Sequence, residues 1–114
     1  GLGDVYKRQL PEPCPNSKPS WFGFLLTCRE GVDKNKVVQY IEDHGVQTRM
    51  LFAGNIVKQP CFDEMRASGK GYRVVGDLAV TDRIMKDTFW LGVYPGMTDE
   101  KIDYMAKVIK EALQ

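Results

Sequence analysis

The stretch "FWLGVYPGMTDEKIDYMAKVIKEAL", residues 89–113, decides the fold, because two kinds of secondary structure meet there at one turn. Residues 89–96 are aromatic and apolar, which predicts a strand, and their Pro-Gly end predicts a turn. Residues 97–113 predict a helix that Thr98 caps, with Lys101 at the position where a capping box has glutamate. Its apolar residues form a single stripe at helical spacing: Ile102, Met105, Ile109 and Leu113.

Further strands and helices are predicted upstream. Residues 21–28, "WFGFLLTC", predict a buried strand. Asp33 as N-cap and Gly45 beyond the C-terminus delimit a predicted helix over about 34–44. A short strand is predicted at about 46–52.

The middle of the chain is less regular. A Gly54-Asn55 turn precedes Pro60, which is predicted to open one short helix. Residues 68–73 predict a loop, and residues 77–88 a further helix. Because each amphipathic helix has one apolar stripe and each sheet face needs a cover, we expect an α+β domain, a small, mostly antiparallel sheet with helices on one face.

The N-terminal segments differ in composition from the rest. Residues 1–9 differ in character from the sequence that follows them, and they do not start with methionine. We therefore predict that they are a non-native tail on a piece of a longer protein. Residues 10–20 contain four prolines and predict an extended linker into the domain, which covers 21–114.

Charge and cysteine usage limit the function classes. The 114 residues carry a formal net charge of +1, which gives no electrostatic case for nucleic acid or an anionic membrane as partner. No apolar run approaches the roughly 20 residues that cross a bilayer. Cys14, Cys28 and Cys61 are far apart and lack a histidine ligand set, which argues against a metal site or a disulfide framework. We therefore expect a reduced, cytoplasmic setting.

Few residues are candidates for catalysis or ligand binding. His44 stands at a predicted helix end with no partner constellation, and a solvated helix-end role is the simpler interpretation. Arg49 and Arg83 lie among apolar neighbours, where each is either a surface arginine or an anion clamp for phosphate or carboxylate. Asn55 and Gln59 add amides that suit sugar hydroxyls.

Three segments resemble one family. They are "PNSKPSWFGF" at 15–24, "TRMLFAGNIVKQP" at 48–60 and "YRVVGDLAVTDRIMKDTFWLGVYPGMT" at 72–98. Over about residues 10–113 the chain resembles the CDP-4-keto-6-deoxy-D-glucose 3-dehydratases of lipopolysaccharide O-antigen biosynthesis. These enzymes are a branch of the DegT/DnrJ/EryC1/StrS aminotransferase-like family. The sugar aminotransferases of that family usually carry a proline-leucine-histidine element where this chain has "LFAGN".

The resemblance implies a fold and a chemistry. The chain would be the small C-terminal α+β domain of a fold-type I pyridoxal-phosphate transferase, inactive alone. The parent would use pyridoxamine or pyridoxal 5′-phosphate and a [2Fe–2S] cluster, both bound outside this fragment. Its partners would be a CDP-sugar substrate, an NADH-dependent iron–sulfur flavoprotein reductase and a second copy in a homodimer.

The resemblance also implies site residues. Arg83 would act in catalysis, and the expected substrate contacts are Arg49, Asn55, Gln59 and Phe22 or Phe24. Two alternatives remain open at this point. The chain could be part of a pyridoxal-phosphate-dependent nucleotide-sugar aminotransferase, or a free-standing module that binds a nucleotide-sugar.

Overall fold

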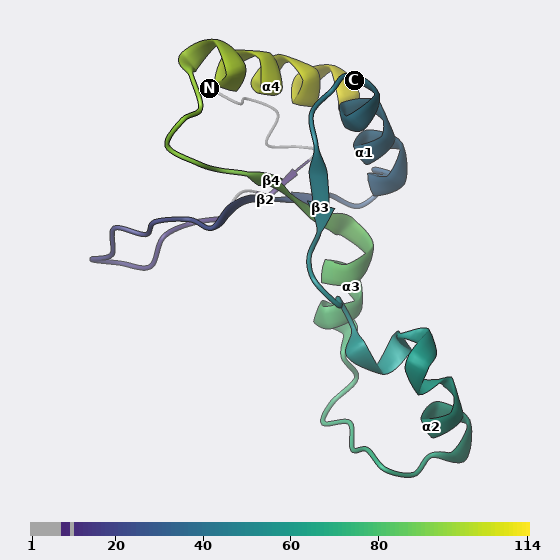
Figure 1. Ribbon diagram of the computed structural model, residues 1–114. Helices are drawn as coiled ribbons and strands as arrows, with labels where there is room; N and C mark the ends of the chain where they lie inside the picture. The colour runs from purple at the N-terminus through teal and green to yellow at the C-terminus, as the bar shows by residue number, and fades with distance from the viewer. Residues whose placement is uncertain (1–7, 10) are drawn as a thin grey trace.

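The computed structural model describes residues 8–9 and 11–114 (Figure 1). Its centre is a four-stranded sheet in the order β1-β2-β4-β3, in which every neighbouring pair is antiparallel. The strands are β1 (Arg8–Gln9), β2 (Gly23–Cys28), β3 (Thr48–Met50) and β4 (Thr88–Gly92). The predicted antiparallel sheet is thus confirmed.

The register of the two central strands separates two faces of the sheet. Leu26 pairs with Phe89 and Leu25 with Trp90, so side chains of successive residues point to opposite faces. Leu26 and Phe89 share one hydrophobic cluster with residues of α1 (Lys34–Asp43) and α4 (Asp99–Ala112), and Figure 1 shows both helices on the same side of the sheet. We call the face on that side the covered face.

The hydrophobic core fills the space between the covered face and these two helices. Ile41 of α1 is fully buried, and Phe89 and Leu91 of β4 are each 1% exposed. The stripe predicted on the last helix is partly wrong: Ile102 is 48% exposed, and Val108 is buried in its place. The first turn of α4 therefore adds nothing to the core. The α+β class with α1 and α4 on one face is confirmed.

The opposite face of the sheet, which we call the open face, carries Leu25, Thr27, Thr88, Trp90 and Arg49. The Thr27 and Thr88 hydroxyls lie 2.9 Å apart and share a hydrogen bond across the two strands. Helix α3 (Ala79–Asp87) runs directly into β4 and borders this face (Figure 1). No residue of α3 is buried.

A separate excursion of the chain, residues 51–78, extends away from the sheet (Figure 1). It contains η1 (Ile56–Lys58), η2 (Pro60–Phe62) and α2 (Asp63–Ser68). Arg66 holds it together by donating to the carbonyl oxygens of Val57, at 2.6 Å, and Gln59, at 3.1 Å. Pro60 opens a helical turn as predicted, whereas η1 was not predicted.

Both predicted helix caps are confirmed. The Asp33 side chain accepts from the Asn35 backbone N–H, and the Thr98 side chain accepts from that of Lys101. The strand predicted over 46–52 is shorter, because the chain leaves the sheet after Met50. No helix among residues 11–114 is long and apolar enough to cross a membrane.

The predicted non-native tail, residues 1–9, lies mostly outside the described residues. Of that segment the structure describes only β1, which pairs with Thr27 and Cys28 of β2.

Candidate functional site

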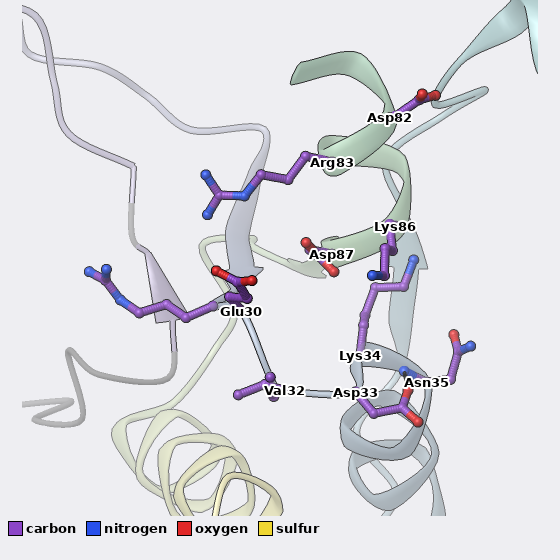
Figure 2. A pocket seen from close by; sticks show the side chains of 11 residues that line it. Glu30, Val32, Asp33, Lys34, Asn35, Asp82, Arg83, Lys86 and Asp87 are labelled. Atoms are coloured by element: carbon purple, nitrogen blue, oxygen red, sulfur yellow. Dashed lines mark hydrogen bonds between the residues drawn. The ribbon is translucent and has the colours of Figure 1, made fainter. Parts of the chain in front are cut away.

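Three connected hollows mark the side of the molecule that α3 borders. The polar hollow, about 1100 Å³, lies between the β2–α1 loop, the start of α1 and α3 (Figure 2). Its lining is rich in charged side chains: Arg29, Glu30, Asp33, Lys34, Asp82, Arg83, Lys86 and Asp87. Acidic and basic groups are equally frequent in it, so the lining has no excess of positive charge.

Two smaller hollows lie on the open face. The central hollow, about 360 Å³, is lined by Pro11, Leu25, Thr27, Leu51, Val80, Arg83, Ile84 and Thr88. The aromatic hollow, about 190 Å³, is lined by Trp21, Phe22, Gly23, Leu25, Leu51, Phe52 and Trp90. Leu25 and Leu51 line both, so the two hollows adjoin. Arg83 is the residue that the central and polar hollows share.

Arg83 stands at the boundary between polar and apolar surface. Figure 2 shows its side chain extending from α3 over the polar hollow, with the carboxylates of Glu30 and Asp87 also turned into that space. Its guanidinium is exposed and makes no hydrogen bond or ion pair with the residues that the structure describes. Within the described part of the chain, nothing occupies the donors of Arg83.

Three other charged groups of the polar hollow, Asp33, Lys34 and Asp82, already have partners in the chain. Lys34 is only 9% exposed and donates from Nζ to the Met85 carbonyl oxygen at 2.9 Å. Asp33 caps α1, and Asp82 points to the other side of α3 in Figure 2. Arg83 is thus better placed for an external anion than Lys34.

Arg49 lies on the open face but outside all three hollows. It is paired in register with Trp90, and its Nη1 donates to the Thr48 carbonyl oxygen at 3.3 Å. The structure therefore places both predicted arginines toward the open face without bringing them into one hollow.

The two predicted amides are engaged within the chain. Asn55 is 2% exposed; its Oδ1 accepts from the Val57 N–H at 3.1 Å and its Nδ2 donates to Asp82 Oδ1 at 2.7 Å. Gln59 is half-buried and donates from Nε2 to the Ala53 carbonyl oxygen. In this arrangement both side chains hold the turn after β3, and a ligand contact by Asn55 would have to replace one of these bonds.

The structure distinguishes between the two candidate phenylalanines. Phe24 packs against the hydrophobic core on the covered face. Phe22 is 76% exposed, lines the aromatic hollow and lies with its ring centroid 5.2 Å from that of Trp90. Phe22 is the member of the pair that a ligand can reach.

The pKa values of Asp82 and Cys28 are shifted from their ordinary values. Hydrogen bonds from Lys58 and then from Asn55 lower the pKa of Asp82 from its ordinary 3.8. Burial, followed by the charge of Asp87, raises the pKa of the Cys28 thiol to about 11, so this thiol is neutral and unreactive. Neither group is a candidate nucleophile.

The described residues do not assemble a metal centre. Among residues 11–114 no group of three or more histidine, cysteine, aspartate or glutamate side chains could hold a metal ion. Cys14 and Cys61 are exposed and free, and Cys28 is buried in the core.

Sequence reasoning missed much of the hollow lining, notably Leu25, Leu51, Phe52 and Trp90. The alternation of strand side chains was the available signal. It places Leu25 and Trp90 opposite the core residues Leu26 and Phe89, and therefore on a face that no predicted helix covers.

The comparisons with known sequences agree with one another. A model of the DegT/DnrJ/EryC1/StrS aminotransferase family matches residues 1–110. The chain is 46% identical over 105 residues to the "Lipopolysaccharide biosynthesis protein RfbH" of Salmonella typhimurium, covering 90% of this chain and 23% of that protein. It is 40% identical over 113 residues to the "dTDP-4-dehydro-2,6-dideoxy-D-glucose 3-dehydratase" of Saccharopolyspora spinosa, covering 97% and 23%. The chain thus spans about a quarter of the length of these curated relatives.

Solved structures share the fold. The GDP-4-keto-6-deoxy-D-mannose-3-dehydratase of E. coli matches with a TM-score of 0.76 at 20% identity, over 95% of this chain and 27% of that one. The sugar aminotransferase CalS13 of Micromonospora echinospora matches with a TM-score of 0.70 at 16% identity, over 96% and 26%. At these identities the likeness concerns the fold alone.

Proposed function

The chain belongs to the DegT/DnrJ/EryC1/StrS aminotransferase family, and on this premise we propose that it is the C-terminal part of a pyridoxamine-phosphate-dependent CDP-4-keto-6-deoxyglucose 3-dehydratase. Such an enzyme removes the C3 hydroxyl of a nucleotide-sugar on the way to a 3,6-dideoxyhexose of the O-antigen. The fragment alone would be inactive. The names of the two sequence relatives support the proposal, since one is a lipopolysaccharide biosynthesis protein and the other a sugar 3-dehydratase.

One observation connects the proposal to this chain: Arg83, which has no ion-pair partner within the described part of the chain, stands where the polar and central hollows meet. A nucleotide-sugar has a charged diphosphate next to a sugar ring with apolar and polar edges. A guanidinium pairs with phosphate or carboxylate oxygens through two parallel hydrogen bonds. Arg83 at this boundary would bind the charged part of the substrate, and the adjoining apolar lining would exclude water from it.

The remaining predicted contacts have unequal support. Phe22, next to Trp90 in the aromatic hollow, offers an exposed ring to a sugar or base. Arg49 would reach a ligand only at the margin of the open face, because it lines none of the hollows. Gln59 would contribute by shaping the turn after β3, since its amide is bonded to the Ala53 carbonyl.

The cofactors do not fit the residues of this chain by themselves. A [2Fe–2S] cluster takes four ligands, usually cysteines, whereas this chain has three cysteines, one of them in the core. The polar hollow is wide and open, and its most buried lysine, Lys34, is taken by a backbone carbonyl. We therefore place both cofactors in the rest of the parent protein and derive no step through them.

The open face is the surface that we propose meets the rest of the parent. It carries exposed aromatic side chains, with Phe22 at 76% and Phe52 at 78% exposure, beside the charged polar hollow. Exposed apolar patches with polar rims are typical of interaction surfaces. A homodimer and an NADH-dependent iron–sulfur reductase complete the proposed system.

The test is the reaction of the complete enzyme. Supplied with pyridoxamine phosphate, a reductase and CDP-4-keto-6-deoxyglucose, it should yield a sugar that has lost its C3 oxygen. Parallel assays with dTDP- and GDP-sugars are needed, since the relatives' names specify those nucleotides. Retention of the C3 hydroxyl with all three nucleotides would overturn the dehydratase proposal.

The second candidate is a nucleotide-sugar aminotransferase, which the fold shared with CalS13 favours. With pyridoxal phosphate and an amino donor such as glutamate, that activity would yield a 4-amino sugar that keeps its C3 hydroxyl. Mass spectrometry of the product separates the two reactions.

A further inference from the structure

We propose that Asn55 and Asp82 form a clasp that positions helix α3, and with it Arg83, over the polar hollow. The inference rests on the role proposed for Arg83. It assigns Asn55 and Asp82 as positioning residues rather than as contacts of the substrate.

The clasp joins the turn after β3 to the start of α3 with good geometry. Asn55 Nδ2 donates to Asp82 Oδ1 at 2.7 Å, and Lys58 Nζ donates to Asp82 Oδ2 at 2.8 Å. The Asn55 backbone N–H donates to Met85 Sδ at 3.3 Å, one turn further along the same helix. Asn55 is 2% exposed, whereas the contact between Lys58 and Asp82 is exposed to solvent.

Helix α3 depends on such contacts, because hydrophobic burial does little to hold it. None of its residues is buried, in contrast to α1 and α4. Its last turn is held by a second polar contact, from Lys34 Nζ to the Met85 carbonyl oxygen at 2.9 Å. The clasp and Lys34 thus fix the two ends of the helix.

Residues 82 and 83 leave α3 in different directions, because successive residues of a helix are about 100° apart. Figure 2 shows Asp82 turned to the far side of α3 and Arg83 turned over the polar hollow. A rotation or shift of α3 that breaks the clasp would therefore displace the Arg83 guanidinium. A displacement of ~1 Å at a catalytic site can cost about 10²-fold in rate.

The test uses Asn55→Asp, which opposes two carboxylates while keeping an acceptor for the Val57 N–H, and Asp82→Ala, which removes both acceptor oxygens of the clasp from the helix side. The double variant Asn55→Asp/Asp82→Asn restores an amide–carboxylate pair with the roles reversed. Gln39→Glu is the matched control, because Gln39 Nε2 donates to Asp43 Oδ1 at 2.8 Å on the exposed side of α1. Each is made in the complete enzyme, and with Arg83→Ala for a double-mutant cycle.

We expect Asn55→Asp to lower kcat/KM by roughly tenfold to a hundredfold, the double variant to recover most of the loss, and Gln39→Glu to match the wild type. In the Arg83→Ala background, Asn55→Asp should have no further effect. Amide hydrogen exchange should become faster in α3 in Asn55→Asp and return toward wild type in the double variant. Asp82→Ala serves in place of Asn55→Asp if the latter does not fold.

The outcomes separate this inference from the proposed function. The positioning role would be overturned if Asn55→Asp lowered kcat/KM by the same factor in the wild-type and Arg83→Ala backgrounds. It would also be overturned if Arg83→Ala lowered turnover and Asn55→Asp did not. Wild-type turnover in Arg83→Ala would instead remove the role of Arg83. In that case amide hydrogen exchange in Asn55→Asp tests the clasp. Faster exchange in α3 would support the clasp, and unchanged exchange would overturn it.

Discussion

The two faces of one small sheet are built from neighbouring residues and differ sharply in burial. On the covered face Leu26 is 2% exposed and Phe89 is 1% exposed beneath α1 and α4. On the open face their neighbours Leu25 and Trp90 are only half-buried and line hollows. The strand alternation thus assigns stability to one side and the proposed binding surface to the other.

The largest expected effect contrasts two adjacent leucines. Leu26→Ala removes a fully packed side chain and should lower the free energy of unfolding by about 2–5 kcal/mol. Leu25→Ala removes a half-buried one and should cost about 1 kcal/mol. Urea denaturation of both variants measures the difference. Equal losses would mean that the open face is as important to the isolated fold as the covered face.

Gly54 tests the tight packing of the turn against α3. Its φ is +61°, and a Cβ there would lie 2.4 Å from Met85 Cγ. Gly54→Ala should therefore cost about 1–3 kcal/mol from overpacking, in addition to backbone strain. Gly69→Ala is the control, because its φ is +66° and nothing lies within 4 Å. If thermal denaturation shows that Gly54→Ala and Gly69→Ala lose the same stability, the close approach of Met85 does not add to the cost at Gly54.

The clasp on the side of the open face should respond to acid. Hydrogen bonds from Lys58 and Asn55 lower the pKa of Asp82, so its stabilising effect is present above the ordinary value of 3.8 and is lost as pH falls through the lowered value. An NMR titration of the Asn55 side-chain amide should show a midpoint below 3.8. A midpoint at or above that value would contradict the clasp.

Cysteine labelling should show whether the core on the covered face is closed. Cys28 lies in the core on the covered face with its thiol pKa raised to about 11, whereas Cys14 and Cys61 are exposed. A colourless disulfide reagent that releases a coloured thiolate should modify two thiols quickly and the third only after unfolding. Three equal rates in the folded chain would show that the core is not closed over Cys28.

Short-range signals predicted the elements of the covered side well. Asp33 and Thr98 cap their helices as predicted, because an N-cap depends only on the next two or three residues. The order of the elements and the single apolar stripe of each helix predict the small, mostly antiparallel sheet. The stripe on the last helix was wrong at Ile102, because helical spacing does not reveal where a helix extends past its partner.

Most contacts on the side of the open face could not be predicted, because they join residues that are far apart in the sequence. Asn55 is 27 residues from Asp82, and no local pattern indicates that a turn and a helix will share that bond. An amide in a polar turn is equally typical of a substrate contact, which is the role that the sequence predicts for Asn55. Whether Arg83, Arg49, Gln59 and Phe22 meet a ligand stays a prediction, although the structure places Arg83 and Phe22 at hollows.

The most direct measurement is the turnover of Arg83→Ala in the complete enzyme, with Lys36→Ala on exposed α1 as the control. We predict a loss of about 10²-fold or more for Arg83→Ala, as for other charge-stabilising donors, with an unchanged melting temperature and wild-type turnover in Lys36→Ala. Wild-type turnover in Arg83→Ala would contradict the assignment of the substrate to this side of the domain.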